Sequence, residues 1–588
     1  MDLGFWKILF FSTLCFFVST GTGRLVAQKN ARSDQFKQEH AWSDPLHIAP
    51  RLSGNFGELR GNHFHTGLDF KTEGREGLVV VAATDGRIAR VKMSPWGYGN
   101  ALYLEGPAGI TTVYAHLQRF ESRIHRWAVE RTYAGRSLGL DARPPLSEGL
   151  EFRAGDTLGW SGNSGSSGGP HLHFEIRNTA NQHPLNPLDG WVAKTDSRPP
   201  VLPALWMETT EAMRTWTWRS GDTLRVPPKV RFSVEGYDLL DGAPNVCGLR
   251  TLEAEATRGN GDLALRYSAS WAELDFGVNK DMNAHALYPI WQSQRDQVHR
   301  LHRLPTNRLA IYGTPADDGW IRLESGEVAS LRVRATDAAG NETVREVTLV
   351  GDPSAASSGW TPVELDWTDR TVEALPTEAG AWSNERVSLS WPEGTFFEPT
   401  SVGWTAKSDE MGGTLHPQAV PYRKPMHVSW AMMASAASWQ AGWSVLPEDV
   451  ASADNWVAVL RDEKGEVDAT AKAVIEHGRV ELDLTRGGEW SLELDTVPPR
   501  VLPYYSGTPI VSNGNAVWYV EDTLSGLDDL ELRVNGEWAR LVWDPKRNMA
   551  TYEASDGMHP LGEPVELVLK ATDEVGNDAV WSGTILWP

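Results

Sequence analysis

Two short segments of this chain carry histidine and aspartate at spacings that suit a metal ion. The first segment is HFHTGLDF, over residues 63–70. Apolar residues alternate in it with His65, Gly67 and Asp69, which is the period of a β-strand. A flat strand would hold the Cα atoms of His65 and Asp69 roughly 13 Å apart, too far for both to reach an ion through bonds of about 2 Å. We therefore expect the chain to bend at Gly67.

The second segment is HLHFEI, over residues 171–176. Its apolar residues alternate with polar ones, so the same strand period places His171 and His173 on one face, about 6.6 Å apart. Two histidines placed in this way suit a site in which one binds a metal ion and the other is a catalytic residue beside it. A third predicted strand, over residues 111–116, ends on another histidine, His116. Three strands that each bring a histidine to one end are difficult to explain as core packing alone.

A glycine-rich stretch, SGNSGSSGGP over residues 161–170, precedes the second histidine strand. Loops of this composition can cradle phosphate, but that use needs a Gly-Lys-Ser/Thr ending and a following helix, and neither is present. We expect this loop instead to let the backbone approach an extended substrate.

Together these motifs resemble the lysostaphin/β-lytic (LytM-like) family of zinc endopeptidases. The family pattern is H-x-x-x-D, then Y-x-H-L, then G-P-H-L-H-F-E. The chain carries all three, at residues 65–69, 114–117 and 169–175. The resemblance covers about 150 residues of the chain, and no element of the pattern is missing.

The resemblance implies one zinc ion per chain, with His65, Asp69 and His173 as its ligands, and it implies that His116 and His171 are catalytic. Two imidazoles and one carboxylate leave a fourth position for water, as in catalytic zinc sites. The chain has no HExxH glutamate, so the two catalytic histidines are the candidates for the base. Sequence does not decide which of them takes the proton.

The predicted fold is mainly β: an antiparallel β-sheet zinc peptidase domain with a helical insertion, then about three immunoglobulin-like β-sandwich domains. A repeat supports the sandwiches, because PPxVLP-type and ATDxxGN segments each occur twice. Helical spacing at 121–135 marks the insertion, which we expect to line the substrate groove. The predicted domains are a peptidase domain at 45–195 with its insertion at 118–154, followed by β domains at 196–352, 353–494 and 495–588.

The N-terminus and the overall charge narrow the location and the partners. Residues 8–18 are apolar but too short to span a bilayer comfortably. They predict a signal peptide at 1–27, with an uncleaved anchor as the alternative; residues 28–44 would be a linker. We expect an exported protein (periplasm, cell surface or secreted) with no membrane span in the mature chain. The net charge of −22 argues against a nucleic-acid partner.

The leading functional hypothesis is a secreted endopeptidase that cuts peptide bonds in peptidoglycan, in stem-peptide cross-links rather than glycine bridges. The alternatives are a secreted protease acting on other glycine-rich proteins, and a non-enzymatic surface or amidase-activator module.

The downstream β domains resemble tails of such peptidases in Bacteroidetes-like bacteria. We expect them to contact the cell wall or other proteins and to take no part in bond cleavage. We also expect no second cluster of metal-ligating residues within them, and a surface position for His299 and His302.

Overall fold

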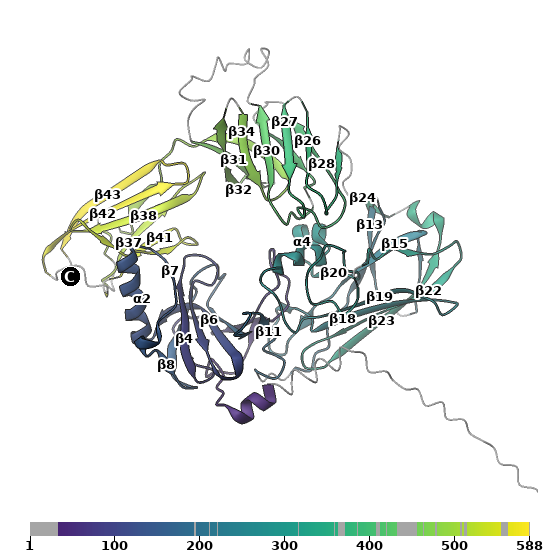
Figure 1. The fold of residues 1–588 in the computed structure, drawn as a ribbon, viewed down its shortest axis with the longest axis horizontal. Coiled ribbons are helices and arrows are strands. Elements are labelled where there is room, and N and C mark those ends of the chain that lie inside the picture. The colour runs from purple at the N-terminus through teal and green to yellow at the C-terminus, as the bar shows by residue number, and fades with distance from the viewer. Residues whose placement is uncertain are drawn as a thin grey trace, which may run out of the picture.

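The computed structural model describes residues 33–588 except 193–195, 211, 220, 316, 358, 363–370, 385, 407–411, 419, 432–454, 463, 477–478, 506–507, 511–513, 554, 556–561 and 587–588. The predicted signal peptide lies outside the described residues. Within them, no helix combines the length and the apolar character needed to cross a membrane. The chain is mainly β and forms four domains arranged in a ring (Figure 1).

The predicted peptidase domain, called the peptidase domain below, is built on one large, antiparallel sheet. Its main path is, in spatial order, β1 (Leu52–Gly54), β2 (Leu68–Lys71), β10 (His171–Asn178), β6 (Ile110–Phe120), β5 (Asn100–Glu105), β4 (Gly86–Met93) and β7 (Leu140–Ala142). Four shorter strands join it: β3 (Val79–Val81), β8 (Glu151–Phe152), β9 (Thr157–Ser161) and β11 (Pro184–Leu185). The predicted alternation holds in β10, where Leu172, Phe174 and Ile176 are fully buried in the core of the domain.

The predicted insertion does contain one helix, α2 (Ser122–Gly135). The Glu121 side chain caps it by accepting a hydrogen bond from the Arg123 backbone N–H. One face of α2 packs Ile124 and Trp127 into the peptidase core. The insertion also supplies β7 and β8, which both pair with β4, at the end of the sheet remote from β2.

Three β domains follow, each made of paired sheets as predicted. The second domain contains β20 (Val298–Arg300), β15 (Lys229–Glu235), β12 (Ala204–Glu208), β13 (Ala212–Thr217), β24 (Thr361–Pro362) and β21 (Ile321–Arg322) in one sheet, and β14 (Thr223–Val226), β23 (Glu342–Gly351), β22 (Val328–Thr336), β18 (Thr251–Arg258) and β19 (Leu263–Ser270) in the other. It also contains β16 (Asp238–Leu239), β17 (Val246–Cys247), α3 (Met282–His285) and α4 (Tyr288–Gln294).

The third domain contains β25 (Val372–Ala374), β28 (Thr400–Ala406), β29 (Gly412–His416), β35 (Gly488–Leu494), β31 (Trp456–Arg461) and β32 (Val467–Lys472), packed with β26 (Gly380–Ser383), β27 (Val387–Trp391), β30 (Met426–Ala431), β34 (Arg479–Leu484) and β33 (Val474–Glu476). The fourth domain contains β36 (Arg500–Pro503), β37 (Ala516–Glu521), β41 (Met549–Tyr552) and β40 (Val542–Asp544), packed with β39 (Glu537–Ala539), β38 (Leu527–Val534), β42 (Pro564–Asp573) and β43 (Asp578–Leu586). The repeated ATDxxGN turns join β22 to β23 and β42 to β43.

The peptidase domain and the second domain share their hydrophobic cores. Phe56, Leu59 and Phe64 of the peptidase domain are buried in the core of the second domain, and Leu240 and Cys247 of the second domain are buried in the peptidase core. A fragment that ends at residue 195 would therefore expose both cores. The segment that we expected to be a linker also takes part, because Phe36 is buried in the peptidase core.

Polar contacts connect the remaining neighbours in the ring. Arg423 of the third domain pairs with Asp281 of the second at 3.2 Å, and Glu398 of the third pairs with Arg300 of the second at 3.0 Å. Between the third and fourth domains, the Asn455 amide donates to the Asn577 side chain at 3.0 Å. The fourth domain returns to the peptidase domain beside α2 (Figure 1).

Candidate metal and catalytic centre

Strand pairing brings the predicted site residues together. His173 of β10 lies opposite Asp69 of β2 on one side and opposite Ala115 of β6 on the other. His116 follows Ala115 directly, and His171 lies two residues before His173 on the same face. The sheet thus gathers at one place residues that are far apart in the sequence.

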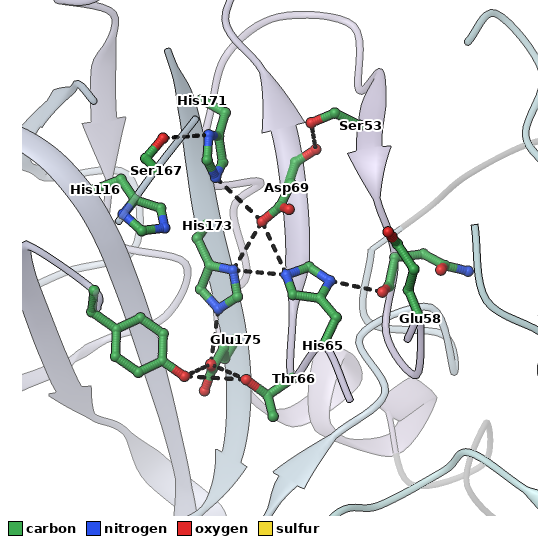
Figure 2. Close-up of polar contacts among 12 residues, drawn as sticks. Ser53, Glu58, His65, Thr66, Asp69, His116, Ser167, His171, His173 and Glu175 are labelled. Carbon is green, nitrogen blue, oxygen red and sulfur yellow. Dashed lines mark hydrogen bonds and ion pairs between the residues drawn. The ribbon is translucent and has the colours of Figure 1, made fainter. Parts of the chain in front are cut away.

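Three ligand atoms converge at the centre of this group (Figure 2). His65 Nε2 lies 3.1 Å from Asp69 Oδ1 and 3.0 Å from His173 Nδ1, and His173 Nδ1 lies 2.9 Å from Asp69 Oδ1. Tetrahedral zinc with bonds of 2.0–2.2 Å separates its ligands by roughly 3.3 Å. The three residues are buried, and their spacing fits one such ion.

The outer hydrogen bonds of the two imidazoles fix which nitrogen faces the centre. His65 Nδ1 lies 2.7 Å from the Asn55 carbonyl oxygen, which can only accept, so Nδ1 carries the proton and Nε2 is bare. His173 Nε2 lies 2.8 Å from Glu175 Oε1, so in the neutral ring its Nδ1 is the bare nitrogen. Two bare nitrogens and a carboxylate oxygen directed at one point form a cation site, and the donor set suits zinc.

The charges around the three ligands favour a cation as well. Burial alone would raise the pKa of Asp69, but the surrounding histidines hold it well below its ordinary value of 3.8. Burial alone would lower the pKa of His173, but its hydrogen bonds to Asp69 and Glu175 raise it to about 9. The same two carboxylates favour a divalent cation beside this ring. Arg60 pairs at 2.9 Å with Asp69 Oδ2, which leaves Oδ1 directed at the centre.

Glu175 supports His173, one of the predicted metal ligands, and none of the sequence motifs predicted a role for it. Its carboxylate is fully buried and accepts hydrogen bonds from His173, from Thr66 Oγ1 at 2.6 Å and from the Tyr98 hydroxyl. Arg177 neutralises its second oxygen. A carboxylate behind a ligating histidine fixes the tautomer and the orientation of the ring. The strand alternation in β10 could have predicted this role, because it places Glu175 and Arg177 on the same face as His173.

His116 has an unusual backbone conformation that aims its ring at the centre. Its φ of 58° lies in the left-handed region, which is strained for this residue type. Near this residue the pairing of β6 is irregular with both of its neighbours, β5 and β9. His116 Nδ1 donates to the Ser164 carbonyl at 2.9 Å, which leaves Nε2 bare. Burial, together with the nearby His171 and His173, lowers the pKa of His116 to about 3. The ring is therefore neutral at neutral pH.

His171 is the second candidate for the residue that accepts the proton. Its Nδ1 donates to the Gly169 carbonyl at 2.8 Å and lies 3.1 Å from Ser167 Oγ. Its Nε2 faces inwards, 3.4 Å from Asp69 Oδ1. The rings of His116 and His171 are neighbours, with centroids 4.7 Å apart. Both histidines thus present Nε2 towards the same space above the ligand cluster.

The second domain holds the segment that carries His65. The Asn55 side chain exchanges two hydrogen bonds with the Gly248 backbone, at 2.9 and 2.6 Å. The Asn279 side chain does the same with the Phe64 backbone, at 3.1 and 3.0 Å. The chain bends between His65 and Asp69 as predicted. Gly67 is needed there for space, because an added Cβ would lie 2.4 Å from the Phe174 carbonyl oxygen.

Two expectations about other histidines and acidic residues were wrong. His299 and His302 are buried, not exposed, because β20 packs into the second domain. The β domains also do contain clustered acidic residues, one group in each of the two repeated units. The groups are Asp196, Asp238 and Asp337, and Asp495, Asp522 and Asp573. The ATDxxGN turns bring one aspartate of each group beside the others.

Comparison with known proteins defines the class of this site. Residues 63–187 match the sequence model of peptidase family M23. The chain therefore contains an M23 metallopeptidase domain, with His65, Asp69 and His173 as its zinc-site-like group.

Individual relatives share this part of the chain. The DD-carboxypeptidase/endopeptidase Mpg of Neisseria meningitidis serogroup B is 33% identical over 150 residues, which cover 25% of this chain and 28% of the relative. The glycyl-glycine endopeptidase ALE-1 of Staphylococcus capitis is 30% identical over 116 residues, which cover 20% and 24%. The chain thus spans about a quarter of the length of these curated relatives. The lysostaphin catalytic domain from Staphylococcus simulans, a solved structure, is 21% identical over 26% of this chain and 93% of its own, with a TM-score of 0.17.

Proposed function

We propose that the whole chain is a secreted zinc metalloendopeptidase that hydrolyses peptide bonds in peptidoglycan, with one zinc ion per chain. The observation that carries this proposal is the convergence of His65 Nε2, Asp69 Oδ1 and His173 Nδ1 to within 3.1 Å of one another. The inward-facing Nε2 atoms of His116 and His171 complete a site with both a metal position and proton acceptors.

The protein's own residues divide the work of hydrolysis. Zinc bound at this site would supply a Lewis acid that polarises the scissile carbonyl and acidifies a water molecule. Backbone carbonyls accept hydrogen bonds from Nδ1 of both His116 and His171, and each ring directs its Nε2 towards the metal position, so either is a candidate to accept the proton of the attacking water. The ring that accepts this proton can then deliver it to the leaving amine. Glu175 and Asn55 hold the ligating rings in place throughout.

The substrate that we propose is a peptide cross-link between stem peptides. The relative with the higher identity is named for DD-carboxypeptidase and endopeptidase activity, whereas the match to the glycyl-glycine endopeptidase is shorter and weaker. Export through a signal peptide at residues 1–27 would bring the enzyme to this substrate, in the periplasm, at the cell surface or outside the cell. The β domains would add contacts with the cell wall.

The test is digestion of purified peptidoglycan by the full-length, zinc-loaded chain, followed by mass spectrometry of the soluble products. We expect cross-linked dimers to be converted to monomers, and one zinc per chain by elemental analysis. Cleavage of glycine-rich proteins but not of peptidoglycan would favour the general protease instead. Zinc-loaded protein that binds walls and cuts neither substrate would favour a non-enzymatic module.

A further inference from the structure

The glycine-rich loop at residues 161–170 orients both catalytic histidines. The Ser164 carbonyl accepts the hydrogen bond from His116 Nδ1 at 2.9 Å. The Gly169 carbonyl accepts the one from His171 Nδ1 at 2.8 Å. The direction of each Nε2 therefore depends on where this loop holds its carbonyl groups.

The peptidase domain itself secures the middle of the loop. Ser164 Oγ donates to the Leu117 carbonyl at 2.8 Å and accepts from the Asn100 N–H at 2.9 Å. Ser166 Oγ accepts from the Gly97 N–H at 2.9 Å. The carbonyl groups on either side of this anchored stretch belong to Asn163 and Ser167.

A residue of the fourth domain, Lys546, binds both of these carbonyl groups. Its Nζ donates to the Asn163 carbonyl oxygen and, at 3.1 Å, to the Ser167 carbonyl oxygen. Lys546 is separated from Ser167 by 379 positions in the sequence. The ammonium group of this lysine thus binds the loop on both sides of Ser164, whose carbonyl group orients the His116 ring.

The insertion in the peptidase domain provides the surface on which the fourth domain docks. The Tyr133 ring of α2 meets the Trp538 ring edge to face, with centroids 5.6 Å apart. Leu138, just after α2, packs against the core of the fourth domain. Beside this contact lies a cavity of about 190 Å³, lined on one side by the loop at Asn163 and Ser164 and on the other by the fourth domain. Residues of the insertion also line it, among them His125 and Leu138. That substrate binds there stays a prediction.

We propose that Lys546 is a positioning residue for His116 and His171, and that the insertion at 118–154 docks the domain that supplies it. The inference rests on the proposed function. Lys546 fixes the carbonyl groups of Asn163 and Ser167. The fraction of molecules in which both Nε2 atoms face the metal position is therefore higher than it would be without this lysine. Small losses of such alignment are costly in rate, because the catalytic group and the substrate must already be oriented for reaction.

The test compares Lys546→Ala and Lys546→Arg in the full-length, zinc-loaded chain, with a soluble cross-linked muropeptide as substrate. Lys570→Ala is the matched control, because Lys570 is a partly exposed lysine of the same domain that pairs with Asp578 at 2.8 Å. It lies on β42, in the sheet that does not contain β40 and β41, the strands on either side of Lys546. We expect Lys546→Ala to lower kcat roughly 3- to 30-fold with little change in KM, while zinc content and melting temperature stay at the wild-type values. Arginine can donate to both carbonyls and should restore most of kcat.

Hydrogen exchange gives a measurement that does not depend on activity. Backbone amides of residues 161–170 should exchange faster in Lys546→Ala and in Trp538→Ala, and at the wild-type rate in Lys570→Ala. Wild-type kcat and wild-type exchange in Lys546→Ala would overturn the inference, as would an equal loss in the Lys546→Arg variant. If the wild-type chain itself cleaves no peptidoglycan, the proposed function fails, and the exchange measurement still decides whether Lys546 holds the loop.

Discussion

Replacing Asn279 by alanine tests whether the second domain is part of the metal centre. Asn279 is buried, and its side-chain amide both accepts from the Phe64 N–H and donates to the Phe64 carbonyl. Alanine would leave these two buried backbone groups without their partner, at about 1–3 kcal/mol each. We expect a total loss of about 2–6 kcal/mol of stability. Phe64 precedes the ligand His65, so zinc affinity should fall about 10- to 100-fold, as when other supports of metal ligands are removed.

Zinc affinity would be measured at neutral pH by competition with a chromophoric chelator, and stability by thermal unfolding of the zinc-free and zinc-loaded chain. Asn260→Ala is the control, because Asn260 is an exposed residue of the same domain whose side chain bonds within its own turn, to Asp262 at 2.8 Å. Wild-type zinc affinity together with a wild-type melting temperature in Asn279→Ala would refute the argument. It would mean that the peptidase domain positions His65 unaided.

Three further predictions concern the ligands, the proton acceptors and the ring of domains. Glu175→Gln should weaken zinc binding about 10- to 100-fold, by chelator competition, because His173 loses its carboxylate partner. His116→Ala should retain zinc in elemental analysis but lose most of its turnover, because His116 is proposed to accept a proton and not to bind the metal. Loss of zinc in this variant would instead identify His116 as a metal ligand. Burial favours the neutral form of Glu398, but its two arginine partners lower its pKa to about 2 from an ordinary 4.5. Its stabilising effect is therefore present above pH 4.5 and lost as the pH falls towards 2. Glu398→Gln should lower the melting temperature at pH 7 and much less at pH 2.5, and an equal drop at both would contradict this.

The sequence was most informative where function depends on strand alternation. His171 and His173 share a face because they are two residues apart in a strand, and Phe174 and Ile176 identify the opposite face as the core. The same period would have placed Glu175 behind His173. The bend at Gly67 was also predictable, since a straight strand cannot bring His65 and Asp69 to one ion. The crowding that requires glycine there, against Phe174, became visible only with the neighbouring strand in place.

Prediction failed where the deciding contacts join distant parts of the chain. His299 and His302 lie in a stretch whose local pattern resembles a surface, yet both are buried, because β20 pairs with β15 inside the second domain. The acidic groups in the repeated units were missed for the same reason. Asp196 and Asp337 are separated by most of a domain in sequence, and only the closing of the sandwich brings them together.

The sequence by itself determined the metallopeptidase motifs, the β character of the chain and the repeated downstream units, because each of these depends on residues a few positions apart. Only the tertiary structure decided that residues of other domains hold the segment that carries His65 and the loop that orients His116 and His171. Asn279 lies 215 positions from Phe64, and Lys546 lies 379 positions from Ser167. Contacts over such separations leave no periodic trace in either segment, since each depends on how whole domains pack and not on the conformation of one strand.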